Sequence, residues 1–185
     1  MRKIFKIILA IFAAIIIAVV AFGAIIFLDV AAYTATGTQT LTPTGTSIGK
    51  AIVIYDPGLS GTAKGVADKV AADLQTKSYT VTVAGVKSSA ASSTSDYKII
   101  VVGGPVYAGA LTSSIKDNLK SISIGESAKV GVFGSGQGPT SSDDIAQLKQ
   151  SMPTRSDLSN AVVVKIGSSE DLNTRAQDFV NQLVA

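Results

Sequence analysis

The segment that most constrains the fold is 98–119, KIIVVGGPVYAGALTSSIKDNL, in which an uninterrupted apolar run leads into two glycines. The run at 99–102 is β-branched and apolar on both faces, which is typical of a parallel strand buried between two layers of helices. Gly103 and Gly104 allow the backbone to approach another group closely, and open parallel sheets bind ligands at the carboxyl ends of strands. Taken alone, GGP is more often a plain turn.

The rest of the chain from residue 50 repeats this order of apolar run and amphipathic segment. The polar stretch 87–96 has room only for a short helix. Strands alternating with helices predict an α/β fold with a parallel sheet and right-handed crossovers. We expect five strands, at 51–55, 79–86, 98–102, 129–133 and 161–166, and four helices, at 62–74, 112–122, 141–151 and 169–183.

The composition excludes several classes of site. The chain has no His and no Cys, so a Ser-His-Asp triad, a thiol nucleophile, an iron–sulfur cluster held by Cys and an ordinary zinc site are ruled out. Difficult chemistry would have to come from a bound cofactor. Of the 16 Lys and Arg residues 13 lie at or after residue 50, as do 12 of the 13 Asp and Glu residues. A nearly neutral domain lacks the basic face that nucleic acids require, so we expect no nucleic-acid partner. Because the usual His and Cys ligands are absent, we also expect no metal.

The N-terminal stretch is long and apolar enough to cross a membrane. Residues 7–28 contain no charge and are rich in Ile, Ala, Val and Phe. A helix of this length, at about 1.5 Å per residue, spans a hydrocarbon core of roughly 30 Å. The alternative is a secretory signal peptide with a cleavage site near residues 30–32, but signal cores are shorter, about 7 to 15 residues. We therefore predict a retained anchor over 1–30.

The charges that flank this stretch predict its orientation. Arg2, Lys3 and Lys6 precede it, and the next basic residue is Lys50. By the positive-inside rule the N-terminus lies in the cytoplasm and the remainder of the chain outside it. The expected location is the cell membrane, as a single-pass protein with an extracytoplasmic domain.

Between the apolar stretch and the domain lies a segment of different composition. Residues 31–49 are rich in Thr, Ser and Gly and carry no charge. Such a segment buries little apolar surface and is typical of an exposed linker. The expected organisation is an anchor at 1–30, a linker at 31–49 and one α/β domain at 50–185.

Three glycine-containing loops are expected to meet at one edge of the sheet, because strand-to-helix loops of a parallel sheet emerge on the same side. In the first, PGLSGT at 57–62, Ser60, Gly61 and Thr62 can aim backbone N–H groups and two hydroxyls at one point, where the helix dipole also favours an anion. N-capping by Ser60 or Thr62 explains the same residues equally well. The loop has neither a Walker pattern nor G-x-G-x-x-G, so a mononucleotide phosphate fits it better than a dinucleotide.

The other two loops offer backbone and one aromatic ring. GPVYAG occupies 104–109 and GSGQGP occupies 134–139. With the first loop they form a clamp for a phosphate at one end and a flat heterocycle between two stretches of backbone.

These motifs resemble those of the flavodoxin-like family of FMN-binding proteins. GGPVYAG is similar to that family's flavin loop, G-[ST]-P-[VI]-Y-x-G, PGLSGT resembles its phosphate loop, [ST]-x-T-G-x-T, and VGVFGSG resembles its fourth-strand loop. The resemblance runs in order through 50–185. It implies a flavodoxin-like three-layer sandwich whose five-stranded parallel sheet has the order 2-1-3-4-5, here preceded by one transmembrane helix. It also implies FMN at the switch between strands one and three.

The resemblance further implies which residues contact FMN. Ser60, Gly61 and Thr62 with neighbouring amides would hold the phosphate, 105–109 would pass along the isoalloxazine, and 134–138 would face its other side. Tyr107 is the side chain expected to contact the ring, the alternative being a plain rim residue. The implied set is Gly58, Leu59, Ser60, Gly61, Thr62, Ala63, Pro105, Val106, Tyr107, Ala108, Gly109, Gly134, Ser135, Gly136, Gln137 and Gly138.

The leading functional hypothesis is a membrane-anchored FMN protein that exchanges electrons with a partner protein or a quinone. One alternative is an FMN-dependent NAD(P)H:quinone reductase, although no dinucleotide motif or Arg cluster is visible. Another is a non-redox extracytoplasmic domain with a degraded flavin site, because Pro57 and Leu59 stand where the family has hydroxyls. Asp56 is either a solvated loop residue or a neighbour of the site, and the helix dipole accounts for Asp143 and Asp144.

Overall fold

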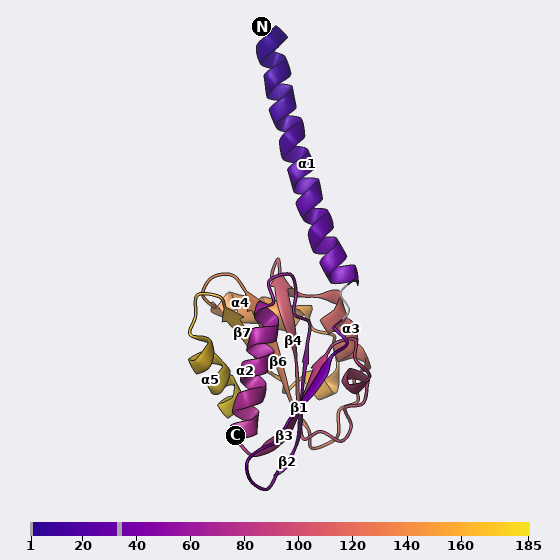
Figure 1. Ribbon diagram of the computed structural model, residues 1–185, viewed down its shortest axis with the longest axis vertical. Coiled ribbons are helices and arrows are strands. Elements are labelled where there is room, and N and C mark those ends of the chain that lie inside the picture. The colour runs from indigo at the N-terminus through magenta and orange to yellow at the C-terminus, as the bar shows by residue number, and fades with distance from the viewer. Residues whose placement is uncertain (1, 33–34) are drawn as a thin grey trace. The chain divides into compact units, whose positions relative to one another are not determined.

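The computed structural model describes the backbone of residues 2–32 and 35–185 and the side chains of residues 9–26 and 35–185. Contacts divide the chain into two units, Met1–Tyr33 and Thr34–Ala185. The first holds helix α1 (Arg2–Ala32), drawn in indigo in Figure 1.

Helix α1 contains the expected apolar stretch. Leu9–Ile26, with a mean hydropathy of 3.1, is long and apolar enough to cross a membrane, a test that a signal sequence near an N-terminus also passes. The three basic side chains that predict its orientation lie outside the part of the chain whose side chains are described.

The second unit contains every predicted strand and helix in the predicted order. Two short 3-10 helices, η1 (Ser89–Ser92) and η2 (Ser156–Leu158), join them. The strands are β1 (Thr38–Leu41), β2 (Gly49–Tyr55), β3 (Tyr79–Gly85), β4 (Ile99–Tyr107), β5 (Ala110–Leu111), β6 (Lys129–Gly136) and β7 (Val162–Gly167), and the α-helices are α2 (Thr62–Thr76), α3 (Ser113–Ser121), α4 (Ser142–Ser151) and α5 (Leu172–Val184).

The sheet has the predicted order at its centre and additional strands around it. Its hydrogen-bonded order is β1-β3-β2-β4-β6-β7, and β5 pairs with β4 off this path. The strands β3, β2, β4, β6 and β7 are parallel and are the five predicted from the sequence. Their order is therefore the expected 2-1-3-4-5. The expected number is wrong, because the sheet has seven strands and includes antiparallel pairs.

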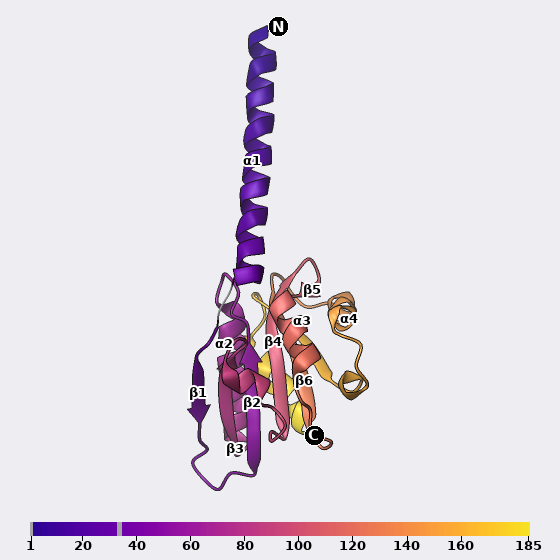
Figure 2. The same cartoon turned by 90° about the vertical axis from the view of Figure 1, so that its right-hand side faces the viewer.

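Strand β1 lies inside the segment that was expected to be an exposed linker. It pairs antiparallel with β3, from Thr38 opposite Ala84 to Leu41 opposite Val81. Figure 2 shows it at the margin of the sheet. Just before it, the Ala35 carbonyl accepts the N–H of Lys87 at 2.9 Å. Residues 38–41 are therefore a strand, largely exposed, and not irregular chain, because β1 pairs with the edge of β3.

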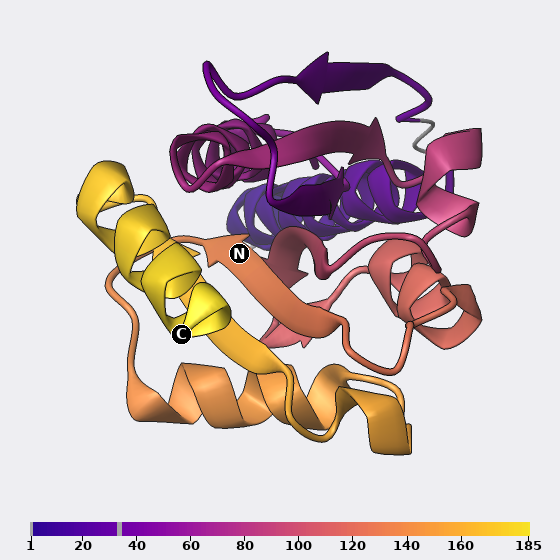
Figure 3. The ribbon, with the colours of Figure 1, turned by 90° about the horizontal axis from the view of Figure 1, so that it is seen from below.

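Helices cover both faces of the sheet (Figure 3), and a hydrophobic layer lies on each face. Helices α2 and α5 pack on one face, and α3, α4 and η1 pack on the other. In α2 the apolar stripe with helical spacing is the buried one, as the sequence predicts. Its residues Val66, Val70, Ala71 and Leu74 are each at most 1% exposed.

Candidate functional site

The first predicted loop connects β2 to α2 and presents two hydroxyls beside a glycine turn. The hydroxyl oxygens of Ser60 and Thr62 lie 2.9 Å apart, and the Thr62 N–H donates to Ser60 Oγ at 3.3 Å. Gly61, with φ of 70°, is the N-cap residue of α2 and has no side chain to cap the helix. Neither Ser60 nor Thr62 is the N-cap residue, although Ser60 Oγ accepts the N–H of Thr62, the first residue of the helix.

Backbone donors gather at the same helix end. Within the described residues, the N–H groups of Gly61, Ala63 and Lys64 donate to no protein acceptor. These are orphan donors of the first turn of a helix, where the macrodipole adds partial positive charge. The arrangement suits an anion.

The second predicted loop is mostly strand. β4 continues through both glycines and Pro105 to Tyr107 and then reverses into β5, with Tyr107 opposite Ala110. The turn consists of Ala108 and Gly109, with φ of 49° and 80°. Two consecutive positive φ values are typical of a type I′ hairpin turn. The prediction of a loop from Gly104 onward is wrong, and the irregular part is confined to this turn.

The first loop and this hairpin touch. A Cβ added at Gly58 would lie 2.7 Å from Pro105 Cγ and 3.3 Å from the Tyr107 hydroxyl oxygen. Gly58 has φ of 61°, so glycine is favoured there for conformation as well as for space. The structure therefore brings the first two predicted segments together.

The third predicted segment lies beside the second. Gly134 and Ser135 belong to β6 and are the register partners of Gly104 and Pro105 in β4. Because β6 continues to Gly136, the expected loop begins later than predicted, at Gln137. The three segments thus form one continuous edge, made largely of backbone.

A partly buried ion pair packs against the third segment. Lys165 on β7 is 8% exposed, and its Nζ lies 3.0 Å from Asp144 Oδ1 at the start of α4. A Cβ added at Gly136 would lie 3.3 Å from Lys165 Cε. The hydrogen bond from the Ser141 N–H contributes most to lowering the pKa of Asp144 to about 2, and the hydrogen bond from Lys165 contributes next.

The carboxylate of Glu170 links β7 to the residues that follow the third segment. Glu170 Oε2 accepts the N–H of Gly167 and the hydroxyl of Thr140, both at 2.6 Å. Burial raises the pKa of Glu170, but these two hydrogen bonds and Arg175 outweigh burial, so the pKa is lowered. Sequence reasoning missed Thr140, Lys165 and Glu170 because no local pattern links residues that meet only in the fold.

Asp56, left open by the sequence, is buried at the junction of the first two segments. Its side chain is 1% exposed. It accepts the N–H of Gly58 at 3.1 Å and the hydroxyl of Thr112 at 3.1 Å, and it also accepts the hydroxyl of Ser114. It is therefore not a solvated loop residue.

The sequence matches no protein-family model and no curated protein. Among solved structures, a flavodoxin from Streptococcus pneumoniae TIGR4 aligns with a TM-score of 0.50 at 21% identity, over 73% of this chain and 97% of that one. The apo form of an NADH:FMN oxidoreductase, EMOB, aligns with a TM-score of 0.53 at 14% identity, over 74% of this chain and 90% of that one.

The domain has a flavodoxin-like fold. At these identities the likeness establishes the architecture alone. In this flavodoxin-like domain the three segments lie at the carboxyl ends of β2, β4 and β6, on both sides of the point where the strand order reverses.

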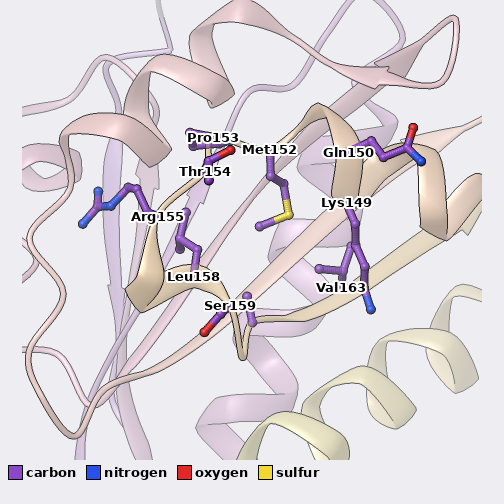
Figure 4. Close-up of a pocket in the computed structure, with 10 residues that line it drawn as sticks. Lys149, Gln150, Met152, Pro153, Thr154, Arg155, Leu158, Ser159 and Val163 are labelled. Atoms are coloured by element: carbon purple, nitrogen blue, oxygen red, sulfur yellow. The ribbon is translucent and has the colours of Figure 1, made fainter.

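A cavity at the opposite edge of the sheet has a different character (Figure 4). It has a volume of about 380 Å³ and is lined by the end of α4, the segment that follows it and the start of β7. Arg155 in its wall donates to the carbonyls of Leu119, Lys120 and Ile122 and pairs with Asp157. Its guanidinium therefore closes the C-terminal end of α3 and is already engaged.

Proposed function

We propose that the flavodoxin-like domain binds FMN at this three-segment edge and carries electrons between redox partners. The observation that carries the proposal is the meeting of Gly58 with Pro105 and Tyr107 beside the unpartnered amides of α2. FMN needs hydrogen-bond donors for its phosphate at one end of the site. At the other end it needs accessible backbone against which its flat ring can lie.

The residues present fit this cofactor through their backbone. The amides of Gly61, Ala63 and Lys64 and the hydroxyls of Ser60 and Thr62 would hold the phosphate. Leu59 has no hydroxyl and is 56% exposed, so it contributes an apolar rim. Gly134 and Ser135 are buried and pair with β4, so the isoalloxazine would lie beyond them, between the β4–β5 hairpin and Gly136–Gly138, with Tyr107 at its edge.

Bound FMN would supply the electron-carrying chemistry. This chain's contribution is binding and orientation. The helix dipole and the amides would stabilise the phosphate charge. The hairpin and the third segment would keep water from the ring, and Lys165, paired with Asp144, packs against Gly136 and would hold that part of the third segment in place. The partner we propose is a redox protein or a quinone.

Flavin binding is tested on the full chain purified in detergent. We expect a yellow protein whose flavin absorption is retained through gel filtration, and an apoprotein that recovers this absorption with added FMN. NAD(P)H oxidation by the yellow protein would move the assignment to the reductase alternative. A colourless protein that FMN does not reconstitute would contradict the proposal and favour the non-redox alternative.

The same proposal places α1 in the cell membrane, with the N-terminus in the cytoplasm and the domain outside. The chain has no Cys, so an introduced one is the only labelling site. We expect Gln177→Cys on α5 to react with a membrane-impermeant maleimide in intact cells and Ile4→Cys to react only after permeabilisation. Labelling of Gln177→Cys only after permeabilisation would reverse the orientation, and loss of residue 4 from the mature chain would identify a cleaved signal peptide.

A further inference from the structure

Asp56 is a buried carboxylate. It follows β2 directly and is 1% exposed, and no ion pair among the described residues includes it. A buried charge is costly unless hydrogen bonds satisfy it. Its carboxylate accepts hydrogen bonds from the N–H of Gly58 and from the hydroxyls of Thr112 and Ser114.

These donors belong to two different halves of the proposed site. Oδ1 accepts the N–H of Gly58, which shapes the first loop, at 3.1 Å. Oδ2 accepts the hydroxyl of Thr112, the N-cap residue of α3 directly after β5, and the hydroxyl of Ser114 in the first turn of α3. One carboxylate therefore ties the phosphate loop to the start of α3, which directly follows the hairpin that would carry the ring.

Asp56 packs closely against the backbone of β4 at Gly104. A Cβ added at Gly104 would lie 3.0 Å from Asp56 Cβ and 2.9 Å from Ile115 Cγ1. The Asp56 N–H also donates to the Gly103 carbonyl at 3.0 Å. The backbone and side chain of Asp56 are therefore both packed against β4. This position in turn fixes the Gly58 N–H and the two hydroxyls that Asp56 accepts.

We infer that Asp56 is a positioning residue that sets the preference of the site for a phosphorylated flavin over the unphosphorylated one. The inference rests on the proposed function. The amides that face the phosphate converge only while Gly58 keeps its left-handed turn against Pro105, and Asp56 holds that turn. The ring half is paired by the β4–β5 ladder and keeps its shape without Asp56. Loss of Asp56 should therefore weaken FMN binding far more than riboflavin binding.

The test compares FMN and riboflavin affinities of three full-length variants in detergent by quenching of flavin fluorescence. We expect Asp56→Ala to weaken FMN binding by about tenfold or more and riboflavin binding by less than about threefold, because the loop donors lose their acceptor. Asp56→Asn should restore most of the FMN affinity, since an amide oxygen still accepts from Gly58 and the hydroxyls can accept from its NH₂ group.

Asp73→Ala is the matched control, because Asp73 is also a buried carboxylate, 9% exposed, but lies on α2 and pairs with Lys69. It should leave the ratio of FMN to riboflavin affinity unchanged.

Equal losses for both flavins in Asp56→Ala, or no loss, would overturn the inference. If the natural chain binds neither flavin, the proposed function fails, and so does the inferred preference for FMN over riboflavin. Hydrogen exchange of the Gly58 amide, faster in Asp56→Ala than in Asp56→Asn, still decides whether Asp56 holds the turn.

Discussion

Gly103→Ala is expected to lower the free energy of unfolding by about 3 kcal/mol, the upper end of the usual cost of overpacking a core. An added Cβ would lie 2.3 Å from Phe133 Cδ1 and 2.4 Å from the Phe133 carbonyl oxygen. Phe133 is fully buried and is the register partner of Gly103 in the adjacent strand, so neither its ring nor its backbone has room to withdraw. Urea unfolding followed by circular dichroism measures the loss.

Gly65→Ala provides the control for this experiment. Gly65 lies on the exposed side of α2, and an added Cβ there meets nothing within 4 Å. Replacing glycine by alanine in a helix interior should raise stability by about 1 kcal/mol. A loss below about 1 kcal/mol for Gly103→Ala would show that the two strands can separate at this point, contrary to the packing described.

Gly58→Ala is expected to weaken FMN binding by about thirtyfold, equivalent to about 2 kcal/mol. Its Cβ would press on Pro105 and on the Tyr107 hydroxyl, and would push the first loop away from the hairpin. Titration with FMN, monitored by flavin fluorescence, measures the effect.

Gly61→Ala separates this steric effect from backbone strain. Gly61 has a similar positive φ, 70°, but an added Cβ there meets nothing within 4 Å. It carries only the cost of a left-handed alanine, about 1 kcal/mol. Similar FMN affinities in the two variants would mean that contact between the loop and the hairpin does not matter for binding.

The centre of the fold was predictable because each buried parallel strand leaves a local signature. The run at 99–102 and the apolar stripe of α2 are examples, and the order of the five strands followed from the resemblance. The ends of strands were not predictable. Gly103, Gly104 and Pro105 usually break a strand, yet β4 continues through them because β6 pairs with them on one side. Strand β1 has no apolar alternation of its own and is defined by its partner β3.

The candidate site was predictable where it is local. The glycines of the three segments do meet, but the sequence reading assigned Gly103 and Gly104 to close approach by a ligand. The structure shows that Gly103 makes room for Phe133 and Gly104 makes room for Asp56 and Ile115. The sequence left open whether Asp56 is solvated or a neighbour of the site, because its hydroxyl partners lie 56 and 58 residues away along the chain.

The pairing of β1 with β3 decides where the domain could be released from its apolar helix without damage. A protease that cuts ahead of Ala35 would free a domain that keeps β1 and the carbonyls that Gly85 and Lys87 use. A cut between β1 and β2 would leave the outer edge of β3 bare, and a bare edge is a template for pairing with other chains. We therefore expect a cut before β1 to release an intact domain, and a cut after β1 to release a domain that is prone to aggregate.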